Sequence, residues 1–403
     1  MGKHGILRTL ACSAVLLSAA SAWSIELHGR SSTQLEWYNN YFDNNKQVEL
    51  GQYLNISLTK IDPAGKLSLE GYGRLTQDIR NGEGLQGRLY YLYADYHDLF
   101  NKVDIRLGRQ FVNYSAGSAL IDGAKIDLKN IGPVALSVMG GRNVIYDLYN
   151  ERTHEGDYAL GVSAYLYNLQ NTDLELSWFH KLIKDDVAQD ILGASGKQYL
   201  FNSLKLYGNT RYDLASEVFG EVLAGVSWFP LDNLIFTTEW YQSYPTFDAT
   251  SIYSVFAVDR YQEWVVKDDY RINKMFSVNG GYTRQDYGEG TSDVVELGVG
   301  VRPIEPLRIH LNYDYVSGYD GKRNGAGIDA DYDLLHNLQL AAGYRYDVDK
   351  YDATTGEVVG RSYYGGATYK LNKKMSFSGR IENNVNSFYK EDWRGRVAFN
   401  LYF

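Results

Sequence analysis

The chain has 403 residues, a net charge of −9, and a composition of 36 Tyr and 40 Gly against 6 Pro and 1 Cys. A helical membrane protein needs runs of about 20 apolar residues, and beyond the N-terminus the sequence has none. The acidic balance disfavours nucleic acid as a partner. Because aromatic residues favour strands and glycine serves turns, the composition predicts one large β-structure.

Residues 1–22 predict a secretory signal peptide that is cleaved from the mature chain. Lys3 and Arg8 provide positive charge, and the short apolar stretch TLACSAVLLSA follows. Ala20-Ser21-Ala22 supplies the small residues that a signal peptidase accepts. Residues 23–403 are then predicted to form a single domain.

The chain's one cysteine, Cys12, is removed with this signal. A lipoprotein signal at Cys12 is the alternative. However, Thr9-Leu10-Ala11 fits poorly as the segment before a lipidated cysteine, and Cys12 lies too close to the N-terminus. A mature chain without cysteine forms no disulfide, no thiolate metal site and no covalent c-type haem attachment, and we predict no cofactor. Loss of Lys3 and Arg8 leaves 38 basic against 49 acidic residues, a net charge of −11.

From Ile25 onward, apolar and polar residues alternate with a period of two, in segments of about 10–13 residues. Strands of a soluble sandwich average about five or six residues, whereas a tilted membrane-spanning strand needs about 9–11. Aromatic residues recur at the strand ends, as at the interfaces of a membrane barrel: Trp37, Tyr38, Tyr96, Phe229, Tyr287, Trp393 and Phe403. The pattern predicts that apolar faces meet lipid and polar faces line a lumen.

The segments between strands alternate between short turns, such as IDPAG and LNKK, and longer polar stretches. The longer stretches are DIRNGEG, NVIYDLYNERTHEG, KDDVAQDILGASG, SYPTFDATSIYS, SGYDGKRNGAG and DVDKYDATTGEVVG. Short turns on one rim and longer loops on the other are typical of outer-membrane barrels. We therefore predict an all-β fold: a closed antiparallel transmembrane up-and-down β-barrel with about 22 strands and no plug domain. The alternative count is 20, if two segments within residues 187–229 merge.

The sequence closes on WRGRVAFNLYF, residues 393–403. This stretch resembles the C-terminal insertion signal of Gram-negative outer-membrane barrels, with Leu401 and Phe403 as its terminal hydrophobic and aromatic residues. Ala398 stands where that family usually carries Gly. The resemblance implies a multi-pass protein integral to the cell outer membrane, whose partners are outer-membrane lipid and the barrel-assembly machinery.

Leu107–Asp127 is the most distinctive internal segment. It resembles a strand–loop–strand segment of Gram-negative porin-like families, in which Gly-Arg-Gln at a strand top precedes a loop and an Asp-Gly. The matching residues are Gly108, Arg109, Gln110, Asp122 and Gly123. We expect Arg109 and Asp122 to pair, either as a constriction charge or as a rim salt bridge that orders a loop.

Charged residues of both signs fall on the predicted lumen faces, where contact with water makes them inexpensive. The candidate lumen-lining residues are Glu26, Arg30, Lys66, Glu70, Arg74, Arg106, Arg109, Asp122, Lys125, Asp127, Arg308, Asp314, Asp329, Asp331, Asp333, Arg345, Arg380, Glu382, Arg394 and Arg396.

Strand count also predicts the size of the bore. Twenty-two strands spaced about 4.8 Å apart and tilted about 40° give a backbone diameter of about 44 Å, which side chains narrow to about 30 Å. Since no plug is predicted and the longest loops have about 15 residues, either loops fold inward or a partner fills the lumen.

Two main functions fit this bore. The first is a porin-like channel for small polar solutes. The alternative is a sheath around a periplasmic multihaem cytochrome for transmembrane electron transfer, similar to the barrel component of porin–cytochrome conduits. A surface adhesin is a weaker alternative, because the loops are modest.

No enzyme is predicted. The mature histidines fall in different strands and turns, without the spacing of a two-His metal site or a neighbouring G-x-S-x-G motif. They are His28, His97, His154, His180, His310 and His336.

Overall fold

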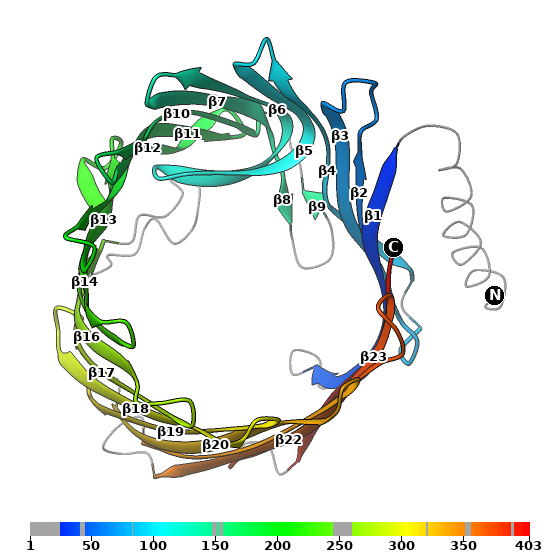
Figure 1. The fold of residues 1–403 in the computed structure, drawn as a ribbon, viewed down its shortest axis with the longest axis vertical. Coiled ribbons are helices and arrows are strands. Elements are labelled where there is room, and N and C mark those ends of the chain that lie inside the picture. The colour runs from blue at the N-terminus through cyan, green and yellow to red at the C-terminus, as the bar shows by residue number, and fades with distance from the viewer. Residues whose placement is uncertain are drawn as a thin grey trace.

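The computed structural model describes residues 25–40, 45–82, 84–146, 151–152, 156–244, 260–319, 321–350, 356–387 and 391–403. The predicted signal peptide lies outside these ranges. Within them, 22 strands form one antiparallel sheet and two short strands form a second sheet. Figure 1 shows the large sheet as a ring viewed along its axis. No helix in this part of the chain is long and apolar enough to cross a membrane.

The first half of the ring is built from strands that pair with their neighbours in chain order. These are β1 (Glu26–Asn40), β2 (Asn45–Thr59), β3 (Leu67–Asp78), β4 (Gln86–Leu99), β5 (Val103–Tyr114), β6 (Gly117–Ile131), β7 (Val134–Asn143), β10 (Tyr158–Leu169), β11 (Thr172–Ile183), β12 (Asp186–Leu200), β13 (Leu204–Asp213) and β14 (Val218–Leu231). Strands β12, β13 and β14 are separate, so the predicted count of 22 is confirmed and the alternative of 20 is wrong.

The second half continues in the same way. It consists of β15 (Leu234–Ser243), β16 (Tyr261–Arg271), β17 (Phe276–Asp286), β18 (Thr291–Ile304), β19 (Leu307–Gly318), β20 (Gly321–Leu335), β21 (Leu338–Lys350), β22 (Val358–Lys370), β23 (Met375–Val385) and β24 (Asp392–Tyr402). The small sheet pairs β8 (Ile145–Tyr146) with β9 (Glu151–Arg152), and both lie inside the ring in Figure 1.

Pairing of the first and last strands closes the ring. Strand β1 pairs with β24 in a register that sets Glu36 opposite Arg396. Beyond this register, the backbone N–H and C=O of Gly29 bond to Phe403 at 2.9 and 3.1 Å. An unpaired backbone N–H or C=O group in lipid costs several kcal/mol, and closure of the ring gives these groups hydrogen-bond partners. The prediction of a closed barrel is therefore confirmed.

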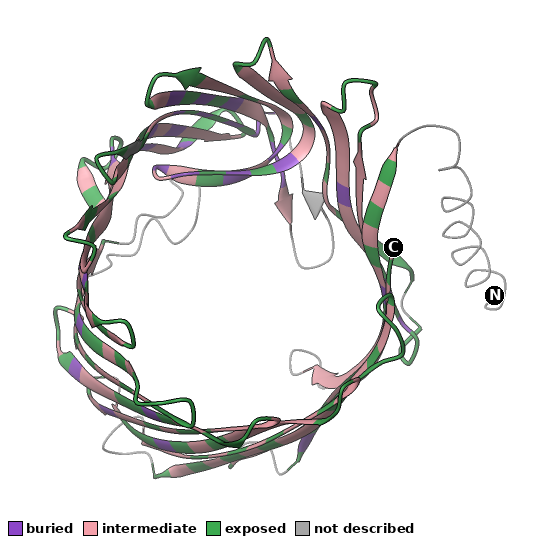
Figure 2. Ribbon diagram, in the orientation of Figure 1, coloured by how far each residue is buried: buried purple, intermediate pink, exposed green. Residues whose placement is uncertain are grey.

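Large apolar side chains cover the outer face of the sheet. Leu107, Leu176 and Trp264 are 54%, 65% and 59% exposed, and many other aliphatic and aromatic residues are exposed to a similar degree. Exposed and less exposed residues alternate along the strands, as Figure 2 shows. An apolar surface of this extent is not stable in water, so it is the face that contacts lipid.

Two stretches predicted as long loops are mostly strand. In KDDVAQDILGASG, only Lys184 and Asp185 form the turn, with φ of 54° and 66°, and β12 begins at the next residue. Two consecutive residues with positive φ form the tight hairpin turn that matches strand twist. In SGYDGKRNGAG, β19 runs to Gly318 and β20 begins at Gly321. The polar residues of both stretches suggest a loop because several are consecutive, as Lys322, Arg323 and Asn324 are, but they belong to strands.

Candidate pore lining

The hairpin of β5 and β6 folds into the interior of the ring. Strand β4 pairs with β5 only from Leu92 to Leu99, so the rest of β5 is free to leave the wall. It leaves at Gly108, where φ is +123° and a Cβ atom would lie 2.4 Å from the carbonyl oxygen of Leu92. Only glycine suits that position. Figure 1 shows the hairpin tip lying inside the ring, beside β7, β10 and β11.

A buried apolar cluster holds the hairpin against the inner wall. Its members come from the hairpin and from β7, β10, β11 and β12: Val112, Tyr114, Ala116, Ala119, Ile121, Met139, Ala159, Phe179 and Ile191. Figure 2 shows buried residues in this sector of the ring. Burying one large apolar side chain contributes about 1.5–3 kcal/mol, so the cluster fixes the hairpin in place.

Hydrogen bonds anchor the two-residue turn at the hairpin tip. The backbone N–H of Ser115 donates to the Glu175 carboxylate at 2.8 Å, and that of Ala116 donates to the Ser177 hydroxyl at 2.8 Å. The Ser115 and Ser177 hydroxyls lie 2.7 Å apart. The Arg211 guanidinium donates to the carbonyl oxygen of Ser115 at 2.9 Å. Buried backbone groups need such partners, and here the wall supplies them.

A second set of contacts covers the point where β5 leaves β4. Arg109 donates two hydrogen bonds of 2.7 Å to the carboxylate of Asp122 and a third, of 3.2 Å, to the carbonyl oxygen of Leu89. The Tyr146 hydroxyl donates to the same carbonyl oxygen. The Arg88 guanidinium lies 4.8 Å from the centre of the Tyr146 ring. Strand β8, which carries Tyr146, is thereby tied to the edge of β4.

Leu107–Asp127 is therefore one continuous hairpin, and the predicted loop within it is wrong. The expected pair of Arg109 and Asp122 is present. These two residues alternate with Val112 and Ile121 of the buried cluster, so they stand on the face of the hairpin that the cluster leaves open. Exposed Phe111 and Asn113 alternate with buried Val112 and Tyr114 along β5. A plain wall strand shows the same alternation, which is why alternation alone did not reveal the inward fold.

Several predicted lumen-lining residues pair with one another, either along one strand or between strands of the wall. Nitrogen–oxygen distances are 2.7 Å for Lys125–Asp127, 3.0 Å for Arg308–Asp333, 2.5 Å for Arg345–Asp314 and 3.2 Å for Arg380–Glu382. These pairs form a charged ladder on the face opposite the apolar one. Such a ladder is stable where water reaches it and costly where it does not.

Other predicted residues have partners that the sequence did not single out. These contacts are Glu26 to Lys60, Arg30 to Asn400, Lys66 to the carbonyl oxygen of Asp98, Glu70 to Tyr93, Arg106 to Asp95, Asp329 to Tyr364 and Arg394 to Asp392. Arg74 lies beside Tyr53, and Asp331 and Arg396 contribute to pockets on the same face. The alternation in YLYADY places Tyr93 and Asp95 on one face, so this signal could have identified both.

No family model matches the sequence, and no curated protein matches it. Solved structures match its fold. A mutant of the ferric enterobactin receptor PfeA from Pseudomonas aeruginosa has a TM-score of 0.66 at 11% identity, over 94% of this chain and 81% of that one. The siderophore receptor PirA from the same organism has a TM-score of 0.62 at 13% identity, over 95% and 81%. The P pilus usher (PapC) translocation pore has a TM-score of 0.51 at 12% identity, over 94% and 99%.

These similarities concern the fold, and they agree with the closed sheet and its apolar exterior. The chain is an outer-membrane β-barrel. Its polar face consequently encloses the barrel interior, and the inward-folded hairpin stands within that interior.

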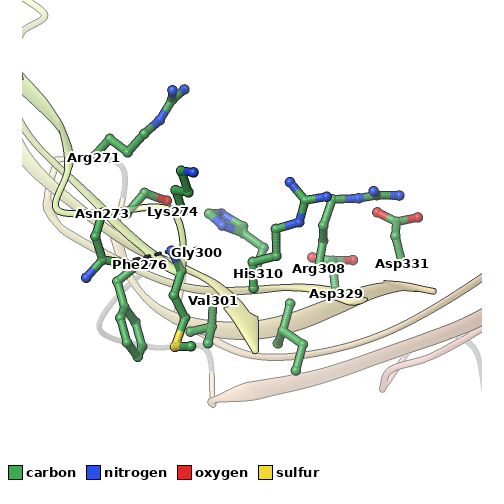
Figure 3. Close-up of a pocket in the computed structure, with 14 residues that line it drawn as sticks. Arg271, Asn273, Lys274, Phe276, Gly300, Val301, Arg308, His310, Asp329 and Asp331 are labelled. Atoms are coloured by element: carbon green, nitrogen blue, oxygen red, sulfur yellow. Dashed lines mark hydrogen bonds between the residues drawn. The ribbon is translucent and has the colours of Figure 1, made fainter. Parts of the chain in front are cut away.

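A pocket of about 600 Å³ lies on the inner face of the barrel at the rim that carries the short turns. Its lining includes Arg271, Lys274, His310, Asp329 and Asp331. Figure 3 shows Arg271, Lys274 and His310 on one side of the sheet, while Phe276 projects to the other side. The pocket therefore brings cationic and anionic groups of the predicted lumen wall around one space.

Proposed function

We propose that this barrel is a porin-like channel that gives small polar solutes a path across the outer membrane. The observation that carries the proposal is the β5–β6 hairpin, which the wall itself holds inside the barrel. A fixed obstruction on one side narrows the bore without sealing it by a separate domain. The charged ladder would then offer permeating solutes an interior that is wet and polar.

The ladder also bears on selectivity. Pairs such as Arg308–Asp333 and Arg345–Asp314 place both signs close together, so neither cations nor anions meet a wall of one charge. We expect weak selectivity for small ions despite the acidic composition. A transport role of this kind needs no catalytic group, and we infer transport in preference to catalysis.

The alternative of a cytochrome sheath is less well supported. A sheath needs a bore that is free along its length, whereas the hairpin tip and β8–β9 occupy part of the interior. The anchors at Ser115 and the buried cluster show that the hairpin is packed against the wall. This favours a channel over a sleeve for a whole periplasmic protein.

The test is conductance of the purified barrel in planar lipid bilayers. We expect stable current steps that scale with salt concentration, and a reversal potential close to zero in a salt gradient. A variant with a shortened tip, in which residues 113–118 are replaced by Asn-Gly, should conduct more because the bore is wider. Barrel that inserts without conducting, or that copurifies with a stoichiometric Soret band, would contradict the channel and favour the sheath.

A further inference from the structure

The rim pocket separates its charges along one direction. Arg271 ends β16 and Lys274 lies in the next turn, so the cationic end belongs to the β16–β17 hairpin. Asp329 and Asp331 lie on β20 and form the acidic end. In Figure 3, Arg271 and Lys274 stand at one side of the view and Asp331 at the other. Arg308 also lies at the acidic end, opposite Asp331, and it is paired with Asp333. The pocket therefore has carboxylates at one end only, while Arg271 and Lys274 stand at the other.

Some charges in and beside the pocket are already compensated. Arg308 pairs with Asp333 at 3.0 Å, and Asp329 accepts a hydrogen bond of 2.7 Å from Tyr364. Arg302 donates to the carbonyl oxygen of Glu305 at 2.8 Å. Within the described part of the chain, the side chains of Arg271, Lys274 and Asp331 make no such bond. Arg308 lies opposite Asp331 in the β19–β20 pair and attracts its charge, but its hydrogen bonds go to Asp333. Asp331, Arg271 and Lys274 thus keep hydrogen-bonding groups that a solute can satisfy.

The distance between the ends indicates the length of that solute. Strands lie about 4.8 Å apart, so the three steps from β17, beside Lys274, to β20 span about 14 Å of wall, and the four steps from Arg271 on β16 span about 19 Å. An extended peptide rises about 3.3–3.6 Å per residue, so three residues span about 10 Å. The long side chains of Arg271 and Lys274 can cover the remainder. The volume of about 600 Å³ is also within the usual range for small-molecule pockets.

We propose that this pocket binds a short peptide with free termini, its carboxylate toward Arg271 and Lys274 and its ammonium toward Asp331. The inference rests on the proposed channel function and names a substrate class for it. A ligand with one charge would satisfy one end of the pocket and leave the other unmatched. A peptide of two or three residues carries both charges at the required separation.

The experiment uses triglycine and two matched probes that each lack one charge. N-acetyl-triglycine has no ammonium group, and triglycine amide has no carboxylate. Binding is measured by isothermal titration calorimetry on the purified, detergent-solubilised barrel, and separately as block of ion current. Each capped peptide should bind about tenfold more weakly than triglycine, because about 1.4 kcal/mol of charge-assisted contact is lost.

Variants assign each terminus to its end of the pocket. The Arg271→Gln/Lys274→Gln variant should bind triglycine and triglycine amide with equal affinity, because the carboxylate has lost its partners. In Asp331→Asn, triglycine should bind no better than N-acetyl-triglycine. The control is Arg361→Gln on β22, which should bind triglycine like the wild type. Arg361 is exposed, and so is Tyr346, its Cα partner on β21.

The calorimetric result decides the peptide proposal whether or not the barrel conducts. Equal binding of all three peptides, no binding of triglycine, or full binding to either pocket variant would overturn it. Absence of current steps with normal triglycine binding would instead overturn the channel function alone.

Discussion

The guanidinium of Arg109 and the carboxylate of Asp122 are joined by two hydrogen bonds of 2.7 Å across the base of the β5–β6 hairpin. The pair stands where β5 departs from β4, and Arg109 also reaches the carbonyl oxygen of Leu89 on that strand. The Arg109 side chain thus joins β5 to β6 at the base of the hairpin and also joins the hairpin to β4.

Removing the charge of Asp122 should loosen the hairpin base. Asp122→Asn keeps the shape of the side chain but gives up an ion pair that, with a partly exposed carboxylate, is worth about 0.2–1 kcal/mol. We expect greater current noise in single-channel recordings and little change in mean conductance. Asp293→Asn, which breaks the Arg284–Asp293 pair on β17–β18, is the control and should leave the noise unchanged. Identical noise in Asp122→Asn and wild type would contradict the role assigned to the pair.

Gly193 on β12 allows the hairpin tip to approach the wall. A Cβ atom there would lie 2.2 Å from the backbone nitrogen of Ala116. Gly193→Val should therefore displace the tip and raise single-channel conductance in planar bilayers. The matched control is Gly365→Val, because no atom lies within 4 Å of a Cβ placed at that glycine. An inserted Gly193→Val barrel with wild-type conductance would show that the tip does not narrow the bore.

Phe403→Asp should cross the inner membrane normally and fail to insert into the outer membrane. Phe403 exchanges two backbone hydrogen bonds with Gly29, and its ring packs where a Cβ of Gly29 would stand, 2.8 Å away. A carboxylate there would put charge at the barrel's closing seam. Fractionation with heat-modifiable gel migration measures insertion, and Phe403→Tyr should insert normally. Efficient insertion of Phe403→Asp would exclude the predicted signal.

Asp62 should make the turn between β2 and β3 sensitive to acid. Its carboxylate accepts hydrogen bonds of 2.7 Å from the backbone N–H groups of Lys66 and Leu67. These amides, that of Leu67 first, hold the pKa of Asp62 below its ordinary value. The carboxylate therefore adds stability above its unfolded-state pKa of about 3.9, and this is lost as pH falls through the lower folded-state pKa.

The measurement for Asp62 is the midpoint of heat-induced unfolding in detergent. At neutral pH the unfolding midpoint of the wild type should be higher than that of Asp62→Asn. The difference between the two midpoints should shrink once the solution is acidic enough to protonate the folded carboxylate. Asp286→Asn serves as the control on the opposite rim. A gap that persists unchanged in strong acid would mean that the charge of Asp62 does not matter.

The strands of the barrel wall could be predicted from the sequence because one physical constraint acts on all of them. Lipid on one side and water on the other force alternation, and that alternation located strands as different as β1 and β24. The same constraint does not locate the starts of β12 and β20, where polar residues such as Lys322, Arg323 and Asn324 are consecutive and resemble a loop.

The candidate pore lining was less readable, because it depends on contacts between segments far apart in the sequence. Arg109 and Asp122 lie close enough along the chain for pairing to be predicted. By contrast, Ser115 meets Glu175 and Ser177 on β11 and Arg211 on β13, all at least 60 residues away along the chain. No local pattern indicates that the β5–β6 hairpin will separate from β4 and pack against the inner face of β7 and β10–β12.

The hairpin is made from two members of the wall, and this sets a limit on how the barrel can respond. A stopper that is a separate domain can be expelled whole, leaving its cylinder intact. Here the obstruction shares backbone hydrogen bonds with β7 through β6 and with β4 through the base of β5. It cannot leave the barrel as a whole without breaking these ladders. The aperture can therefore change only by movement of the tip against its contacts with β11 and β13.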